Sequence, residues 1–303
     1  MKYLARRAAM SVVQLGLLSV IAFFMLNAVP GDFYLPAKVE LNSSTAALEQ
    51  WRVQHGLNRP WIAQYAEWVS SALHGEFGRS LAYEMPVARL IGPRIANTLK
   101  IVVPALLLCW CAGVGLAIAA VRRGRNAIAS VELGAVAVSF LPDVIGVSLL
   151  MWLVVGLRVQ SIATMWLPIL CLTLTLMPAV VLHSTNALST ASGLPFVRLA
   201  ERRGILGVRL WRSYLFPAAA NPLVSLAGLS LAGAIGSSLL VEVLLGWPGL
   251  GPMFLEAALT RDYPVVISVV MLLGTVLTIS NLLADLVLYR LDPRIRLGDE
   301  NRG

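Results

Sequence analysis

Long apolar runs dominate this chain, and short polar segments rich in arginine separate them. An α-helix needs roughly 20 mostly apolar residues to cross the hydrocarbon core of a bilayer. Six runs are long enough, at residues 8–30, 98–121, 128–157, 163–185, 217–243 and 265–289. The pattern predicts an all-α, polytopic membrane protein with about six transmembrane helices and a helical extracytoplasmic loop region.

The first run could be mistaken for a secretory signal. Its apolar stretch is longer than a signal core, and residues 27–31 (NAVPG) make a poor cleavage site, so we expect a retained membrane helix. The third and fifth runs exceed the required length, which predicts tilted or kinked helices. Prolines inside the runs also favour kinks, because each leaves backbone groups that neighbours must satisfy. These prolines are Pro142, Pro168, Pro178 and Pro222.

The positions of lysine and arginine predict how the spans are oriented, because short cytoplasmic segments carry an excess of these residues. With the N-terminus in the cytoplasm, 15 of the 24 lysines and arginines fall in short cytoplasmic segments. They lie within residues 2–7, 122–125, 198–212 and 290–302. Both termini are then cytoplasmic, and residues 189–213 form a cytoplasmic loop.

Residues 31–97 then form an extracytoplasmic region that is too long for a simple connector. Residues 46–55 and 61–73 have helix-like patterns, and we expect these pieces to cap the outer mouth of the protein. The region contains no cysteine, so no disulfide supports it.

The composition agrees with a membrane protein and disfavours several other classes. Hydrophobic residues make up 58% of the chain and charged residues only 13%, which is far too apolar for a soluble domain. The net charge is +8, but the basic residues gather at the ends of apolar runs. They therefore indicate topology and contact with anionic membrane lipid, and we expect no nucleic-acid binding.

Residues that could carry chemistry are sparse. All three cysteines lie in apolar runs, where we expect small buried side chains, and the three histidines do not have the spacing of a metal site. These residues are Cys109, Cys111, Cys171, His55, His74 and His183. The chain has no GxxxxGK[ST] phosphate loop and no catalytic constellation outside the membrane, so we expect no enzyme, no bound metal and no cofactor. Energy for active transport would have to come from an ion gradient or from another subunit.

A short basic segment lies between the fourth and fifth apolar runs. Pro195 suits the first turn of a helix, and Gly204 suits its end, since a left-handed cap costs glycine little. One face at helical spacing holds Phe196, Leu199, Ala200 and Arg203. The segment is either a docking helix, where a membrane subunit meets a soluble motor, or a helix that lies on the membrane surface.

One acidic residue falls within a predicted span. Asp143 follows Pro142 in a run of valine, serine, phenylalanine, leucine and glycine. An acid at membrane depth usually faces a partner or a water-filled path. Asp143 is therefore either a translocation-path residue or a structural carboxylate near a helix end or against another subunit.

Other residues in the spans suggest structural roles. Three acids lie nearer to span ends: Glu132, Glu242 and Asp285. Five glycines permit close approach of helices: Gly113, Gly115, Gly228, Gly233 and Gly236.

Eight segments spread along nearly the whole chain carry a further signal: 55–65, 75–80, 94–98, 196–204, 242–251, 261–264, 281–285 and 291–296. Each segment alone is a weak signal, whereas the ordered set is specific. In this order, the segments resemble the membrane permeases of binding-protein-dependent ABC importers, in their dipeptide, oligopeptide and nickel branch.

The resemblance implies a single transmembrane permease domain over residues 1–303 in a bacterial cytoplasmic (inner) membrane. It implies a second permease subunit, two cytoplasmic ATPase subunits that use ATP, and an extracytoplasmic substrate-binding protein. It also implies that residues 196–204 couple ATP-driven closure of the motor to reorientation of the spans, for import of peptides or another small solute. The residues expected to couple to the ATPase are Phe196, Val197, Arg198, Ala200, Glu201, Arg203 and Gly204.

The chain departs from the family pattern at three places. Leu194 and Pro195 replace an acidic residue before the loop's aromatic, and residues 216–218 (FPA) replace a stretch that is often basic. Asp143 stands where an uncharged residue is expected. An alternative function is a stand-alone secondary transporter or channel that uses Asp143 as its ion site. The basic cytoplasmic loop and the lack of a visible inverted repeat both favour the importer.

Overall fold

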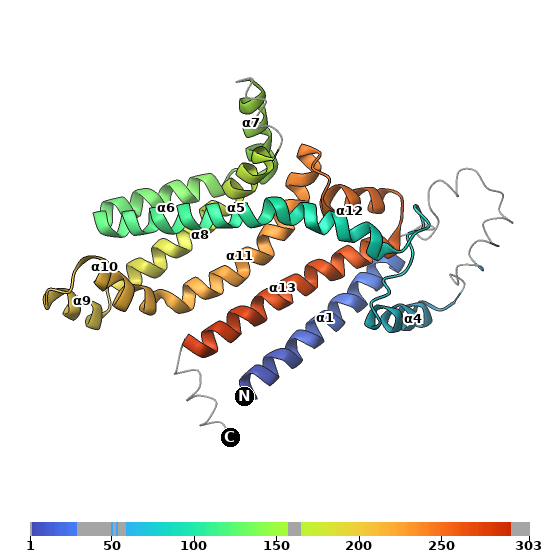
Figure 1. Cartoon of the computed structure of the whole chain (residues 1–303), viewed down its shortest axis with the longest axis horizontal. Coiled ribbons are helices and arrows are strands. Elements are labelled where there is room, and N and C mark those ends of the chain that lie inside the picture. Colours follow the sequence, from blue (N-terminus) through green and yellow to red (C-terminus); the bar gives the residue numbers. More distant parts are fainter. Residues whose placement is uncertain (1, 29–49, 51–52, 54–58, 157–164, 292–303) are drawn as a thin grey trace.

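The computed structural model describes residues 2–28, 50, 53, 59–156 and 165–291 (Figure 1). Regular structure in these residues is helical, apart from an isolated β-bridge between Arg79 and Pro86. The helices are α1 (Lys2–Ala28), α4 (Trp61–Leu73), α5 (Val87–Arg123), α6 (Arg125–Ser139), α7 (Asp143–Gly156), α8 (Trp166–Ser192), α9 (Pro195–Arg202), α10 (Gly207–Leu210), α11 (Phe216–Leu245), α12 (Leu250–Leu259) and α13 (Tyr263–Leu291). A π-helical turn, η1 (Trp211–Leu215), joins α10 to α11. The all-α fold class expected from the apolar pattern is confirmed.

The long helices run between two distinct ends of the molecule. One end carries α9 and α10, and we call it the α9 end; the other carries α4 and α12, and we call it the α12 end (Figure 1). An ion pair between Arg7 and Asp285, with nitrogen and oxygen 3.2 Å apart, joins α1 to α13. Near the α12 end, the C-terminal part of α1 meets α4 through an edge-on contact between the rings of Phe23 and Tyr65.

Five helical segments among the described residues are long and apolar enough to cross a membrane: 6–25, 87–123, 166–192, 207–245 and 263–290. Together α6 and α7 would form a sixth span, but they bend by 94° where they meet. The predicted third span, 128–157, is therefore not one continuous helix. The break falls at Phe140–Pro142, beside the proline for which a kink was expected, and α7 turns away from the direction of α6 (Figure 1). Val147 and Val154 of α7 are still part of the apolar core.

Helix α8 is the most buried of the candidate spans and packs along α5. Buried residues of both helices, such as Ile101 and Leu172, form one apolar core with Ala234 and Val241 of α11. Gly113 permits the close approach of α5 and α8, because a Cβ there would lie 2.8 Å from Val180 Cγ1. Small residues let helices approach closely in this way within membranes.

The other glycines singled out from the sequence divide into two groups. A Cβ on Gly228 would lie 2.8 Å from the Cβ of Ala284, so this glycine permits close packing of α11 on α13. A Cβ on Gly115, Gly233 or Gly236 would meet no other atom within 4 Å, so the expected close approach is wrong for these three within this chain.

Helix α5 begins eleven residues before the predicted start of the second span. Its first turns carry Val87 and Ile91, which are buried against Leu250, Met253 and Val265 of the α12–α13 region. Tertiary packing stabilises these additional turns of α5, and the length of an apolar run in the sequence does not reveal such packing. Of the two expected outer helices, 61–73 is confirmed as α4, whereas 46–55 lies almost wholly outside the described residues.

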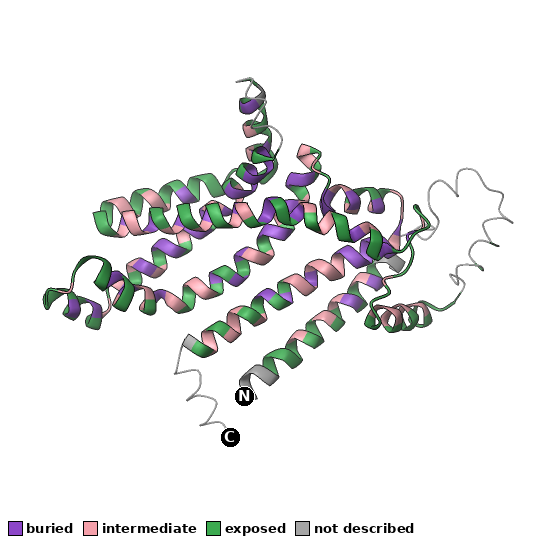
Figure 2. Ribbon diagram, viewed as in Figure 1, coloured by how far each residue is buried: buried purple, intermediate pink, exposed green. Residues whose placement is uncertain are grey.

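Figure 2 shows that exposed residues cover much of α1, α6 and α7. Many of them are large and apolar, including Val12 at 70%, Leu133 at 71% and Trp152 at 75% exposure. A soluble domain rarely exposes apolar surface on this scale, whereas lipid or another membrane subunit would cover it.

Candidate functional site

Helix α9 has well-defined ends that follow from its sequence. Pro195 is its first residue, where the missing N–H has no partner to lose. Gly204 follows its end with φ +83°, a left-handed conformation that side chains with a Cβ resist. The Gly204 N–H donates to Glu201 O at 3.0 Å, and the Ile205 N–H donates to Ala200 O at 3.1 Å. This pair of bonds is the Schellman helix stop, and it confirms the roles expected for Pro195 and Gly204.

One face of α9 is seated on the rest of the chain. Val197 and Ala200 are only 2% and 4% exposed, and they pack in a cluster with Ala117 of α5, Leu188 of α8 and Leu215 of η1. Ala200 therefore does not share an exposed face with Phe196, Leu199 and Arg203, as the helical spacing had suggested. Its small side chain instead lets α9 lie close to the helix bundle.

The opposite face of α9 is open. Phe196 and Leu199 of α9 are 51% and 50% exposed, although the buried face of the same helix packs on the bundle. The charged residues of the segment are also exposed: Arg198, Glu201, Arg202 and Arg203. Further along the chain, Leu206 and Val208 are 62% and 76% exposed. The α9 end thus presents apolar side chains surrounded by arginines.

A cation–π contact connects this end to α5. The Arg122 guanidinium carbon lies 5.2 Å from the centre of the Trp211 ring, and Trp211 is almost buried within η1. Such a contact between arginine and tryptophan is favourable, and more so when it is shielded from water. A displacement of the α9–α10 segment would therefore also move the C-terminal end of α5.

Asp143 lies at the break between α6 and α7. It is the first residue of α7 and is exposed, and Pro142 O accepts hydrogen bonds from the N–H groups of Ile145 and Gly146. An acid in the first turn of a helix interacts favourably with the helix dipole. The structure leaves Asp143 apart from the α9 segment, and its place on a translocation path stays a prediction.

A polar network at the α12 end fixes the turn between α11 and α12 against α5. The Trp247 Nε1–H donates to Asn97 O at 3.0 Å, and the Asn97 side-chain amide donates to Pro248 O at 3.0 Å. Thr98 Oγ1 accepts the Leu250 N–H at 3.0 Å. Residues 94–98 and 242–251, two of the segments that carry the family resemblance, therefore contact each other.

Glu242 lies beneath this turn without any exposed surface. Its Oε2 accepts the Gly251 N–H at 2.7 Å, whereas Oε1 has no hydrogen-bond partner among the described residues. Gly249 lies directly against its carboxylate, with no room for a side chain. The structural role expected for Glu242 agrees with this arrangement, which holds the start of α12 in place.

A second network joins residues 75–80 to residues 261–264, again two segments of the resemblance. Asp262 is almost fully buried and accepts hydrogen bonds from the Ser80 hydroxyl and from the N–H groups of Leu81 and Ala82, the latter two at 3.1 and 3.2 Å. A buried carboxylate needs such donors to offset its loss of hydration. Asp262 thereby fastens the segment before α5 to the start of α13.

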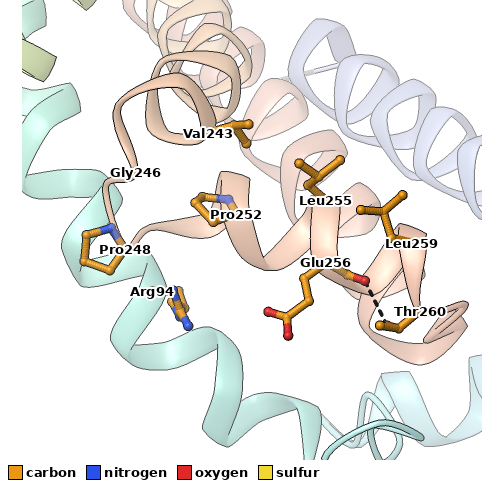
Figure 3. A pocket seen from close by; sticks show the side chains of 9 residues that line it. All are labelled: Arg94, Val243, Gly246, Pro248, Pro252, Leu255, Glu256, Leu259 and Thr260. Atoms are coloured by element: carbon orange, nitrogen blue, oxygen red, sulfur yellow. Dashed lines mark hydrogen bonds between the residues drawn. The ribbon is translucent and has the colours of Figure 1, made fainter. Parts of the chain in front are cut away.

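A cavity of about 480 Å³ opens between α5 and α12 (Figure 3). Arg94 of α5 and Glu256 of α12 extend into it, and its other walls are mainly apolar. Tyr83 OH donates to Glu256 Oε1 at 2.5 Å. This hydrogen bond, with a smaller effect of burial, raises the pKa of the Tyr83 hydroxyl above its ordinary value.

Sequence reasoning had not singled out Tyr83, Arg94, Glu256 or Asp262. Arg94 and Asp262 lie inside segments quoted for the resemblance, so their position was a signal. However, Asp262 bonds to residues 80–82, and Arg94 shares its cavity with residues from 243–260. Tyr83 and Glu256 lie outside those segments. Only the tertiary fold brings these four residues to one end of the molecule.

The fold and the α9 segment together define a class: a polytopic membrane protein with a basic, two-faced surface helix between long spans. Two family models match the chain. The model described as "Binding-protein-dependent transport system inner membrane component" matches residues 111–297, and a model for the N-terminal part of such membrane components matches residues 1–101.

Several curated relatives match along nearly their whole length. The oligopeptide transport system permease protein AppB of Bacillus subtilis (strain 168) is 27% identical, with 97% of this chain and 98% of AppB covered. The dipeptide transport system permease protein DppB of Escherichia coli (strain K12) is 25% identical, with 98% and 99% covered. The glutathione transport system permease protein GsiC of Escherichia coli O1:K1 / APEC is 28% identical, with 98% and 99% covered.

The chain belongs to the family of inner membrane components of binding-protein-dependent transport systems. It is a multi-pass inner membrane protein and the permease component of an ABC importer, which confirms the function inferred from the ordered segments. The alternative of a stand-alone transporter or channel is not favoured.

Proposed function

We propose that this chain is one of two permease subunits of an ATP-driven peptide importer, and that α9 is where it docks on a cytoplasmic ATPase subunit. The observation that carries the docking role is the two-faced seating of α9. Val197 and Ala200 fix the helix to the bundle, while Phe196 and Leu199 are left open to another protein. A helix that only lay on lipid would need no such tight seat on α5, α8 and η1.

The charged residues of the segment fit a soluble partner. Arg198, Arg202 and Arg203 surround the exposed apolar side chains, as polar rims surround apolar anchors at protein interfaces. Movement of the ATPase would pull on α9, and its buried face would transmit that movement to α5, α8 and α11. In this assignment both termini and the α9 end are cytoplasmic, and the α12 end faces the substrate-binding protein.

Peptides are the substrate class that the relatives support best. The names of AppB and DppB specify oligopeptide and dipeptide transport, and glutathione, named for GsiC, is itself a small peptide. The full transporter would contain a second permease subunit, two ATPase subunits that use the ATP, and an extracytoplasmic binding protein. This chain would bind membrane lipid but no nucleic acid, metal or cofactor, and would have no ATPase site of its own.

Reconstitution tests this function. The complex of this chain with its partner permease and ATPase subunits is placed in proteoliposomes with the binding protein, and uptake of radiolabelled di-, tri- and tetra-alanine is measured. We expect uptake that needs both ATP and the binding protein, and none with ADP. Uptake driven by a proton or sodium gradient without ATP would favour the stand-alone transporter, and ligands that co-purify with the binding protein would identify the natural substrate.

A further inference from the structure

We propose that the cavity between α5 and α12 is a subsite for the two charged ends of a short peptide. Arg94 binds the peptide carboxylate, and Glu256 binds its α-ammonium group. The inference rests on the proposed function, because it assigns residues of this chain to the peptide that the importer carries. It places a first contact for substrate at the α12 end.

The charges in the cavity are opposite, yet they form no direct ion pair with each other. Arg94 and Glu256 both extend into the same space (Figure 3), but no ion pair within 4 Å joins them in the described structure. A cation and an anion held apart across a cavity match a zwitterion, whose own two charges are separated by its backbone. A ligand with a single charge would leave one of the two residues without a counterpart.

Arg94 is well suited to hold a carboxylate. Its side chain is half-buried, lines the cavity and forms no hydrogen bond with another described residue, although its charge also acts on the buried Glu242 carboxylate. A guanidinium can bind a carboxylate through two parallel hydrogen bonds, which are stronger than bonds between neutral groups. Partial burial strengthens such a pair further, because water screens it less.

Glu256 is held in a defined position by its neighbour. Tyr83 donates to Oε1, which leaves Oε2 as an acceptor for the N–H groups of an ammonium ion. Because Tyr83 precedes α5 and Glu256 is on α12, this hydrogen bond also joins the segment before α5 to α12. The carboxylate is therefore oriented before a ligand arrives.

The remaining walls suit peptides of varied sequence. Pro248 and Pro252 provide rigid apolar surface, and Leu255 and Leu259 provide flexible apolar side chains. The volume of about 480 Å³ lies within the range of small-molecule sites, which is roughly 300–1,000 Å³. A site that recognises only the ends of a peptide, with apolar contact in between, would accept many side chains.

Protection of a thiol in the cavity tests the site in the assembled transporter. Leu255 lines the cavity and is 43% exposed, so Leu255→Cys provides a reactive thiol. Cys109 and Cys171 are buried as expected, whereas the expectation of burial is wrong for Cys111, which is exposed and is removed by Cys111→Ala. The modification rate by methyl methanethiosulfonate, a neutral reagent, is measured by mass spectrometry with trialanine, N-acetyl-trialanine or trialanine amide as competitor.

We expect trialanine to slow the modification and each blocked peptide to be about tenfold less potent, as expected for loss of a charge-assisted hydrogen bond. Arg94→Gln should weaken trialanine about tenfold and abolish its advantage over the amide, because the carboxylate contact is already lost. Glu256→Gln should abolish the advantage over the acetylated peptide in the same way. Arg89→Gln and Glu76→Gln, matched exposed residues outside the cavity, should change nothing.

Equal potency of free and blocked peptides, or unchanged potency in both cavity variants, would overturn the subsite. So would the absence of protection, or a thiol that reacts in the isolated chain but not in the assembled complex, since another subunit would then fill the cavity. Uptake of alanine peptides by the unsubstituted transporter is measured alongside. Normal uptake without protection overturns only the subsite, whereas no uptake of any alanine peptide overturns the proposed function and the subsite with it.

Discussion

Two glycines at the α12 end have no room for a methyl group. A Cβ on Gly251 would overlap the backbone of Leu239, and one on Gly249 would overlap the Glu242 carboxylate. Here glycine is required by close approach within the chain, since the start of α12 lies directly on the last turns of α11. Close packing against Glu242 and against the backbone of α11 thus explains Gly249 and Gly251, whereas Gly246 has open space around it and adopts a left-handed φ of +65°.

We expect Gly251→Ala to destabilise the α12 end, because overpacking a filled site typically costs about 1–3 kcal/mol. The thermal unfolding midpoint of the purified complex in detergent should fall. Gly236→Ala is a suitable control, since a Cβ there meets nothing within 4 Å and alanine favours a helix over glycine by about 1 kcal/mol. An equal loss of stability in both variants would contradict the packing explanation.

Asp143 provides a separate test at the residue scale. If its carboxylate faces the translocation path, Asp143→Asn should preserve assembly and reduce uptake most for substrates with a free cationic group, because a carboxylate attracts a cation strongly where water is scarce. Complex yield and uptake per complex are measured together. A fall in yield with normal uptake per complex would instead assign Asp143 a structural role. If neither yield nor uptake changes, Asp143 has neither the path role nor the structural one.

At the scale of the element, α9 combines a buried face with an exposed one over only eight residues. Isolated helices this short are unstable in water, so its stability depends on its caps and on its seat against the bundle. The helix stop at Gly204 and the exposed face of α9 can be tested by separate substitutions.

Gly204→Val should impair coupling, because a β-branched residue resists the left-handed conformation at φ +83° and strain of this kind costs roughly 1–3 kcal/mol. Stimulation of ATP hydrolysis by loaded binding protein is the measurement. Gly204→Asn is the matched control, since asparagine adopts this conformation more readily and should retain most of the stimulation. If valine and asparagine behave alike, the helix stop has no part in coupling.

The buried and exposed faces of α9 should respond differently to polar substitution. Ala200→Glu places a charge among apolar side chains and should lower the yield of assembled complex, since an unpaired buried charge is costly. Leu199→Ser changes an exposed residue and should leave yield intact but reduce the ATPase stimulation several-fold, as loss of an interface anchor does. Normal stimulation in the Leu199 variant would exclude this face as the docking surface.

At the scale of the whole molecule, the proposed orientation places the two ends on opposite sides of the membrane. We expect a thiol from Leu73→Cys to react with a membrane-impermeant maleimide in sealed cells, and one from Leu206→Cys to react only after lysis. Both positions are well exposed, at 82% and 62%, so accessibility to the reagent depends on the side of the membrane. The Cys111→Ala background removes the exposed native thiol, and the opposite labelling pattern would reverse the orientation.

Periodicity and length were enough to predict most of the membrane helices. Apolar side chains must cover about 20 helical residues to cross a bilayer, so the run 265–289 located both ends of α13 to within two residues. The run 163–185 located the start of α8 to within three residues, but α8 continues to Ser192. Local chemistry likewise predicted both ends of α9, because proline and glycine restrict or permit backbone conformations wherever they occur.

Only the tertiary structure decided which surfaces meet. Helical spacing grouped Ala200 with Phe196 and Leu199, but contact with α5, α8 and η1 determines which of them is buried. The bend between α6 and α7, the early start of α5, and the placement of Arg94 and Glu256 around one cavity also depend on packing between segments distant in sequence. Helices form through interactions between residues that are near neighbours in the sequence, so a sequence pattern can predict them. Which helix faces are buried, and against which partners, depends on residues far apart in the sequence, and the pattern does not show which of these residues meet.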